Sequence, residues 1–172
     1  MIDNSRISKD NYYLMMAKSA AMRSTCIRRH FGSIIVKNDV IISTGYNGAP
    51  RGRINCIDLG YCERDKLNIP KGQRYELCRS LHSELNAIIA GTYQDMKDST
   101  LYLVGVDAAT NNIDGSVSPC MMCERAIINA GIAKIVIATE SNPDGIIINN
   151  KALLVNDLIE DTDRYQWGHN YV

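Results

Sequence analysis

The sequence has no excess of charge of either sign, few aromatic side chains and no long apolar run. Its 172 residues include 19 Lys and Arg against 19 Asp and Glu, and only one Trp and one Phe. Proteins that bind polynucleotides usually carry a basic excess and stacking aromatic side chains, so this composition argues against such a partner. The apolar runs fall far short of the roughly 18 to 20 residues that a membrane-spanning helix needs, so no membrane partner is expected.

Signals for export and for a second domain are also missing. The residues after Met1 contain no basic cluster followed by an apolar stretch, so we expect no signal peptide and a cytoplasmic location. There are no internal repeats and no linkers rich in Pro, Gly or Ser, and the length suits a single domain over residues 1–172. Because cytoplasmic thiols stay reduced, metal binding is the leading explanation for the six cysteines.

Helix and strand patterns alternate along the chain. Apolar residues at spacings of three and four, with helix start and stop signals, predict helices at residues 10–24, 81–91 and 118–130. In the third helix, Ser118 is the expected N-cap and Pro119 the expected first helical residue. Runs of β-branched residues predict strands at residues 33–37, 40–44, 100–106 and 134–139, of which the first two form a hairpin.

This order of elements is that of a mixed α/β fold. Helical crossovers between the later strands predict parallel pairing there, and a sheet with helices on both faces is the expected architecture. Residues 152–155 fit either another strand or a helix that continues through Leu158 and Ile159. Residues 45–78 are polar and rich in Gly, Pro and Asn, and a loop of this length inside a compact domain is usually functional.

Two short motifs begin the second and third predicted helices, His82-Ser83-Glu84 and Pro119-Cys120-Met121-Met122-Cys123. Cys120 and Cys123 are three residues apart, so a helix places their sulfurs on one face, and a helix start favours thiolates. With His82 they make three ligands of a tetrahedral zinc whose fourth position is left for water, which is typical of a catalytic zinc site. Glu84 is placed to take a proton from that water.

Each motif alone has an ordinary explanation. A C-x-x-C pair can be redox-active, structural or a coincidence, and an H-x-E motif by itself carries little information. Together, H-x-E followed by P-C-x-x-C, each at the start of a helix, form the signature of the zinc deaminases. From the first helix to about Thr139, the chain therefore resembles the cytidine deaminase superfamily in its motifs and in its order of elements.

The resemblance implies a fold and a reaction. The fold would be a three-layer α/β/α sandwich around a central mixed five-stranded sheet, with zinc between the N-termini of the two motif helices. The reaction would be hydrolytic: hydroxide adds to the ring carbon that carries the amino group. Glu84 then moves a proton to the ring nitrogen and to the leaving amine, and ammonia departs.

The loop Gly45-Tyr46-Asn47-Gly48-Ala49-Pro50 indicates the substrate. By itself it reads as a turn, but it resembles the substrate loop of deoxycytidylate (dCMP) deaminases. Their H-A-E-x-N-A-I motif is similar to the sequence that begins at His82. The resemblance implies that the substrate site includes Asn47, which would contact the sugar, and also Gly48, Arg23 and Ser118. Further candidates for the phosphate, which solvated loop charge explains equally well, are Arg28, Arg51 and Arg53.

Two features depart from the family pattern. Ser83 replaces the usual Ala between His82 and Glu84, a change that we expect to be tolerated. Residues 107–115 lengthen the connection between the third predicted strand and the Pro-Cys motif, which family members cross almost directly. Because this segment would lie beside the pocket, it bears on the fine substrate preference.

The remaining cysteines are Cys26, Cys56, Cys62 and Cys78. They can be separate buried thiols that act as small apolar residues. The polar loop is a poor place for core packing, however, and some phage and bacterial dCMP deaminases that this pattern resembles hold a second, structural zinc. We therefore predict a closed site of four thiolates that anchors the long loop.

The predicted function is zinc-dependent hydrolysis of dCMP to dUMP and ammonia, which supplies a thymidylate precursor. The alternatives are a deaminase of another cytosine nucleotide or nucleoside (dCTP, CMP or deoxycytidine) and a non-catalytic zinc module. Retention of Glu84 argues against the last, since a structural zinc site does not use a proton carrier. The resemblance also implies a homo-oligomer, commonly a hexamer, with dCTP and dTTP as possible allosteric effectors.

Overall fold

The computed structural model describes residues 6–70 and 72–160. Residues 1–5, where a signal peptide would begin, lie outside the described residues, as do residues 161–172 of the predicted 1–172 domain. Within the described part, no helix is both long enough and apolar enough to cross a membrane.

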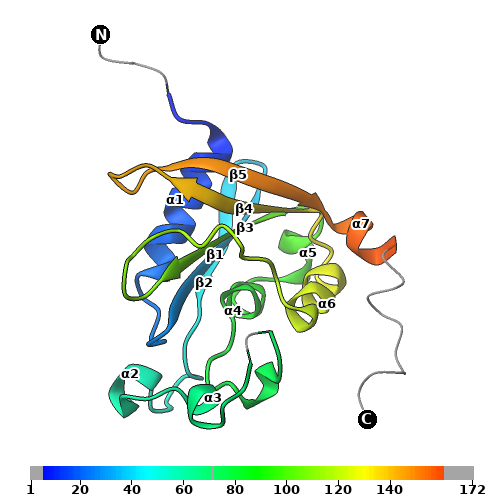
Figure 1. Ribbon diagram of the computed structural model, residues 1–172. Coiled ribbons are helices and arrows are strands. Elements are labelled where there is room, and N and C mark those ends of the chain that lie inside the picture. Colours follow the sequence, from blue (N-terminus) through cyan, green and yellow to red (C-terminus); the bar gives the residue numbers. More distant parts are fainter. Residues whose placement is uncertain (1–5, 71, 161–172) are drawn as a thin grey trace.

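A mixed five-stranded sheet forms the centre of the fold, with strand order β2-β1-β3-β4-β5 (Figure 1). The strands are β1 (Arg29–Lys37), β2 (Val40–Tyr46), β3 (Thr100–Asp107), β4 (Lys134–Ser141) and β5 (Ile147–Leu154). The crossover pair β3 and β4 is parallel, as predicted, and the other three neighbouring pairs are antiparallel.

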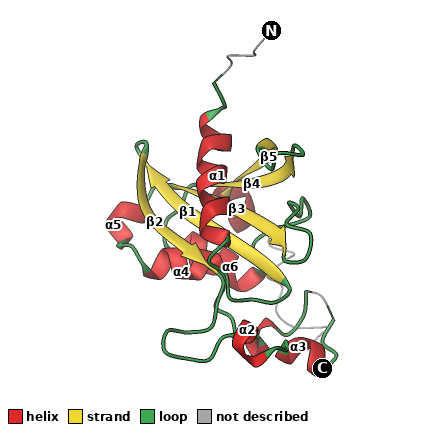
Figure 2. Cartoon of the chain, turned by 90° about the vertical axis from the view of Figure 1, so that its left-hand side faces the viewer, coloured by secondary structure: helices red, strands yellow, loops and turns green. Residues whose placement is uncertain are grey.

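Helices cover both faces of the sheet, which confirms the predicted three-layer sandwich (Figure 2). One face carries α1 (Lys9–Ala21), and the other carries α4 (Ser83–Ile89), α5 (Tyr93–Met96) and α6 (Met121–Asn129). The last described helix, α7 (Val155–Glu160), follows β5 and contacts α6.

The apolar side chains of β3 divide between two cores, one on each face of the sheet. Leu101 and Leu103 lie in the core under α4 and α6, whereas Tyr102 and Val104 lie in the core under α1. Successive side chains of a strand point to opposite faces, so a strand that is buried on both faces is apolar throughout. This explains why residues 100–106 form a continuous apolar run.

Several element boundaries differ from the sequence-based predictions. β1 begins at Arg29 rather than at residue 33, because residues 29–33 pair with the end of β3. Helix α6 begins at Met121, so Ser118 and Pro119 are not its N-cap and first residue. The N-cap is Cys120, whose backbone is extended and whose carbonyl accepts the hydrogen bond of Glu124 N at 2.9 Å.

The ambiguous residues 152–155 belong to two elements. Residues 152–154 end β5, where they pair with β4, and Val155 begins α7. Both of the alternatives that the sequence left open are thus partly right.

The polar segment 47–81 extends away from the sheet beyond α4 (Figure 1). It contains the one-turn helices α2 (Cys56–Leu59) and α3 (Glu63–Lys66) and a 3₁₀ turn (Tyr75–Leu77), where the sequence indicated a loop. Two backbone hydrogen bonds between Gly48 and Leu81, of 3.2 and 2.8 Å, join its two ends. The two ends of the segment therefore lie side by side, and Leu81 at its second end directly precedes His82.

The lengthened connection 107–117 folds back along the end of β3. Val106 pairs with Ile113, and Asp114 N donates to the carbonyl of Gly105 at 2.9 Å. The carboxylate of Asp114 also forms an ion pair with Arg29, at the start of β1. These contacts hold the connection against the sheet.

Two glycines allow helices to approach the sheet closely from opposite faces. A Cβ on Gly32 would lie 1.9 Å from the carbonyl oxygen of Ala17 in α1. A Cβ on Gly45 would lie 2.2 Å from the carbonyl oxygen of Ser83 and 2.4 Å from the nitrogen of Ala87, both in α4. Since backbone atoms cannot move aside as a side chain can, only glycine fits at these two positions.

Replacing Gly45 by Ala should therefore push α4 away from the sheet. We expect Gly45→Ala to lower the free energy of unfolding by about 2 kcal/mol or more, measured by denaturant titration of the zinc-loaded protein. Gly91→Ala is the control, because its added Cβ would meet the flexible end of Met96 and should cost clearly less. Equal stability of Gly45→Ala and the unaltered protein would contradict the close approach.

Candidate metal and catalytic site

Two helix N-termini on the same face of the sheet meet at the candidate site. His82 is the N-cap of α4, Cys120 is the N-cap of α6, and Cys123 lies in the first turn of α6. The two helices contact each other. Both N-cap residues have extended backbones, so their side chains lie at the helix ends, where unpaired N–H groups and the helix dipole favour anionic ligands.

The three side chains form a group of the size that a metal ion needs. The sulfurs of Cys120 and Cys123 each lie 3.4 Å from Nδ1 of His82, and the ligand atoms all lie within 4.8 Å of one another. In a tetrahedral zinc site, bond lengths of about 2.3 Å to sulfur and about 2.05 Å to nitrogen place the two ligand atoms about 3.6 Å apart. The observed spacing and the donor set therefore fit zinc with one coordination position open.

The two thiols titrate as a pair. The hydrogen bond with Cys123 lowers the pKa of Cys120 to about 4, with a smaller contribution from His82. The same hydrogen bond, together with burial, raises the pKa of Cys123, because the pair retains one proton between its two sulfurs. Binding of zinc would displace that proton, since the metal takes both cysteines as thiolates.

The ring of His82 is packed by residues of the segment 47–81. Burial acts to lower the pKa of His82, but the hydrogen bond to Cys120 and the charge of Glu84 raise it overall. The ring of Tyr75 meets the His82 ring edge-on, with centroids 5.1 Å apart. Arg64 lies 4.6 Å from the centre of the Tyr75 ring and donates to the carbonyls of Pro70 and Gln73. The segment thus supports the histidine from outside.

Glu84 is buried beside this group, with 4% of its surface exposed. Its Oε2 accepts a hydrogen bond of 2.9 Å from the hydroxyl of Ser83, which is 2.8 Å from the hydroxyl of Ser33. A buried carboxylate is costly unless it is hydrogen-bonded or has a partner. Its position next to the candidate metal ligands fits a group that moves protons.

Sequence reasoning missed Ser33, Arg64 and Tyr75. Ser33 carried a signal, because it is a polar residue at the start of a run of β-branched residues and is fully buried in the structure. Arg64 and Tyr75 belong to no recognisable motif, and only the folded segment brings them to His82.

The loop residues Asn47 and Gly48 lie next to the start of α4, but the amide of Asn47 is already engaged. Its oxygen accepts from Phe31 N at 2.8 Å and from the Ser24 hydroxyl at 2.6 Å, and its nitrogen donates to the carbonyl of Arg29 at 3.0 Å. Asn47 thereby fixes the loop to β1. Contact between Asn47 and a sugar remains a prediction.

The other predicted substrate contacts are at the surface. Arg23 and Ser118 are exposed, and Arg23 directly precedes the serine that hydrogen-bonds Asn47. Among the alternative phosphate ligands, Arg51 and Arg53 are exposed, whereas Arg28 forms a 2.7 Å ion pair with Asp65. A substrate phosphate would therefore have to compete with the carboxylate of Asp65 for Arg28.

The remaining four cysteines lie close enough to affect one another. Burial raises the pKa of Cys56, as do the thiols of Cys26, Cys78 and Cys62. Arg28 contacts two of them, through its N–H to Cys26 at 3.5 Å and its guanidinium to Cys62 at 4.0 Å. In the part of the chain that the structure describes, no three of these sulfurs are as tightly grouped as the ligand atoms of the His82 site.

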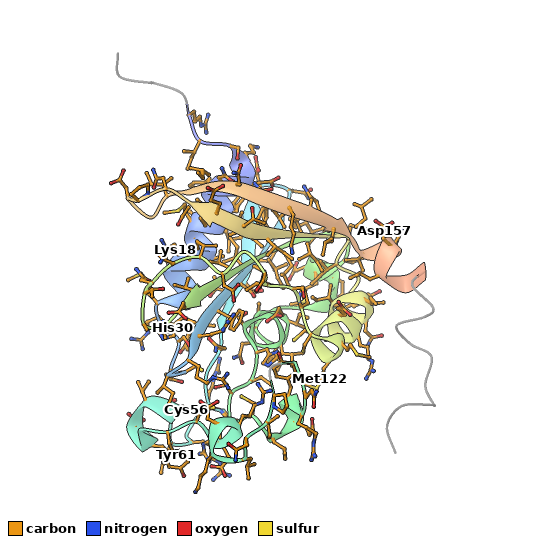
Figure 3. The ribbon with its side chains drawn as sticks, viewed as in Figure 1. Lys18, His30, Cys56, Tyr61, Met122 and Asp157 are labelled. Carbon is orange, nitrogen blue, oxygen red and sulfur yellow. The ribbon has the colours of Figure 1, made fainter. Side chains whose placement is uncertain are left out.

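Cys56 of α2 lies at the lower left of the view in Figure 3, on the opposite side from Met122 of α6. A 3.2 Å backbone hydrogen bond from Ile57 to the carbonyl of Thr25 ties α2 to the residue before Cys26. The group therefore joins the end of the first helical region to the long segment.

Comparisons with known proteins agree with this geometry. The family model described as the cytidine and deoxycytidylate deaminase zinc-binding region matches residues 7–139. A deoxycytidylate deaminase of Schizosaccharomyces pombe is 35% identical over 140 residues, which make up 81% of this chain. The chain spans only 39% of that relative's length. The deoxycytidylate deaminase of Mycobacterium phage D29 is 32% identical over 142 residues, 80% of this chain and 99% of the phage protein.

A solved structure is similar as well. The apo crystal structure of a dCMP deaminase from the cyanophage S-TIM5 is 25% identical in sequence and superposes with a TM-score of 0.51. The match covers 76% of this chain and 82% of the cyanophage protein.

Removing one ligand from the His82 group should abolish tight zinc binding. Even residues that only orient ligands change metal affinity by about 10- to 100-fold, so we expect Cys123→Ser to weaken zinc affinity by more than about 100-fold. Competition with a chromophoric chelator measures the affinity. Ser118→Ala, next to the site but without a ligand atom, is the control and should bind zinc as the unaltered protein does. Unchanged affinity in Cys123→Ser would exclude this ligand set.

Proposed function

The chain belongs to the cytidine and deoxycytidylate deaminase family, and from this premise we propose that it is a zinc-dependent hydrolase that converts dCMP to dUMP and ammonia. The observation that carries the proposal is the buried carboxylate of Glu84, two residues from a zinc-sized His/Cys/Cys group. A non-catalytic zinc module has no use for such a carboxylate, since burying it is costly.

The residues of the site divide the chemistry between them. His82, Cys120 and Cys123 would hold the zinc with one coordination position open, where the metal would lower the pKa of a bound water to about 7. Glu84 takes one proton from the attacking water and delivers it to the ring nitrogen next to the amino-bearing carbon. It then takes the second proton from the oxygen added to the ring and passes it to the amine, which departs as ammonia. The helix starts at His82 and Cys120 turn their N–H groups toward the anionic ligands.

Three features support dCMP over other cytosine compounds. Relatives named deoxycytidylate deaminase match most of this chain. The loop at Asn47 and Gly48 is held against the start of α4, where a sugar bound near the zinc would reach it. Arg23 is exposed close to that loop and offers a cation for a single phosphate. The alternatives are dCTP, CMP and deoxycytidine.

A substrate panel tests the proposal. Among dCMP, dCTP, CMP and deoxycytidine, we expect zinc-loaded protein to have the highest kcat/KM for dCMP. The reaction is measured by the loss of absorbance of the cytosine ring. Glu84→Gln should lower kcat by about 10²- to 10⁴-fold because it cannot carry the proton, while its zinc content stays the same. Glu140 is exposed and lies at the C-terminal end of β4, so the control variant Glu140→Gln should leave kcat unaltered. Failure of all four compounds to react would refute an enzymatic role.

The four remaining cysteines form the basis of a second proposal, a structural zinc bound by Cys26, Cys56, Cys62 and Cys78. Burial first, and then the neighbouring cysteines, raise the pKa of Cys56 and of Cys78, and a divalent cation would stabilise their thiolate forms. Cys56 begins α2 and Cys62 is the N-cap of α3, so each of these single-turn helices carries one thiol of the group. The metal would then anchor a segment that has little core of its own.

Zinc stoichiometry tests this second site. We expect elemental analysis to find two zinc ions per chain, and one in each of Cys56→Ser and Cys120→Ser. The melting temperature of Cys56→Ser should fall while its remaining zinc still supports turnover. One zinc per chain in the unaltered protein, with the four thiols freely titratable, would rule out the second site.

Assembly, regulation and location are further parts of the proposal. We propose a homo-oligomer, and specifically the hexamer that the family resemblance implies. Exposed apolar side chains along α4, α5 and α6 support an assembly through this face: Ile89, Tyr93, Met121 and Met122. Binding of dCTP and dTTP as opposing effectors is proposed on the same family basis. Thiolate ligands need a reducing compartment, which supports a cytoplasmic location.

A further inference from the structure

A chain of two buried hydroxyls ends on the carboxylate of Glu84. Ser33 and Ser83 are both fully buried, and their hydroxyl oxygens are 2.8 Å apart. The Ser83 hydroxyl is also 2.9 Å from Oε2 of Glu84. Ser33 comes from β1 and Ser83 from the first turn of α4, so the chain joins the sheet to the site.

The direction of these hydrogen bonds follows from the donors that each group has. An ionised carboxylate only accepts, so Ser83 must donate its single hydroxyl proton to Glu84. Ser83 then has no proton left for Ser33, and Ser33 must donate to Ser83. The two hydrogen bonds therefore run in one direction: Ser33 donates to Ser83, and Ser83 donates to Glu84.

The packing around the pair keeps it in this arrangement. Gly45 is the cross-strand partner of Ser33, and its missing side chain lets the backbone of Ser83 come close to the sheet. Water has no access to either serine, because both are fully buried. The Ser83 hydroxyl is thus held between one donor and one acceptor.

We propose that Ser83 is a positioning residue for the deamination reaction, and that Ser33 orients it. Its hydroxyl holds Oε2 of Glu84, so the carboxylate keeps one rotamer and presents its other oxygen, Oε1, to the attacking water and the ring nitrogen. This role rests on the proposed function. It makes the departure from Ala at this position part of the catalytic machinery rather than a tolerated change.

The same helix offers a matched control. Ser43 in β2 is also buried and also donates to α4, at 2.8 Å to the carbonyl of Ala87. This hydrogen bond goes to the helix backbone, about one turn beyond Glu84. Ser43→Ala therefore removes a buried serine hydrogen bond to α4 without changing the contacts of the carboxylate.

Kinetics of alanine variants test the proposal. Ser83→Ala should lower kcat for dCMP about tenfold with KM and zinc content within about twofold, because a charge-assisted hydrogen bond to the proton carrier is lost. Ser33→Ala should lower kcat less, and Ser43→Ala should leave it within twofold. In the Ser33→Ala/Ser83→Ala double variant, kcat should stay as low as in Ser83→Ala. Recovery of kcat there would show that a stranded Ser33 hydroxyl caused the loss, and would overturn the proposal.

A spectroscopic readout does not depend on turnover. The chain contains six glutamates, so carbon-13 NMR of zinc-loaded protein labelled at the glutamate carboxyl carbon can resolve Glu84, assigned by its absence in Glu84→Gln. The Glu84 signal should move in Ser83→Ala and stay in place in Ser43→Ala. An unmoved signal in Ser83→Ala would overturn the proposal. If the unaltered protein did not turn over dCMP, the proposed function would fail, but this measurement would still decide whether Ser83 holds Glu84.

Discussion

The close packing of α4 against β1 and β2 is the constraint on which the site depends. The helix backbone approaches Gly45 closely, and the amide of Asn86 donates to the carbonyl of Tyr46 at 2.7 Å. These contacts fix both the height and the rotation of the helix. Because His82 caps this helix and Glu84 lies in its first turn, the candidate metal ligand and the proposed proton carrier are placed together.

The rest of the site is arranged around that helix. The parallel crossover from β3 to β4 brings α6 beside α4, so Cys120 and Cys123 reach His82 from a second helix N-terminus. On the outer side, Arg64 and Tyr75 support the ring of His82 from the long segment. That segment is itself held at the Gly48 and Leu81 bridge. Each ligand therefore has a separate structural support, which suits a preorganised metal site.

The residue types and spacings of the motifs were enough to predict the chemistry. His82, Glu84, Cys120 and Cys123 have few joint uses other than a zinc site with a proton carrier, because each supplies a donor or a base that the others lack. Element types also followed from local pattern, as in the apolar run of β3. Boundaries were less certain: Ser118 and Pro119 form a good local helix start, yet tertiary contacts place the first turn at Met121.

The sequence by itself therefore determined the sheet-and-helix class, the two motif helices and the candidate metal ligands, since these depend on local periodicity and donor chemistry. Only the tertiary structure decided which residues support the ligands. Ser33 meets Ser83 across 50 positions of the chain, and Tyr75 meets His82 through the fold of an irregular segment. Likewise, Asn47 is engaged by the backbone of β1. No local pattern encodes such contacts, because they arise only when distant segments pack together.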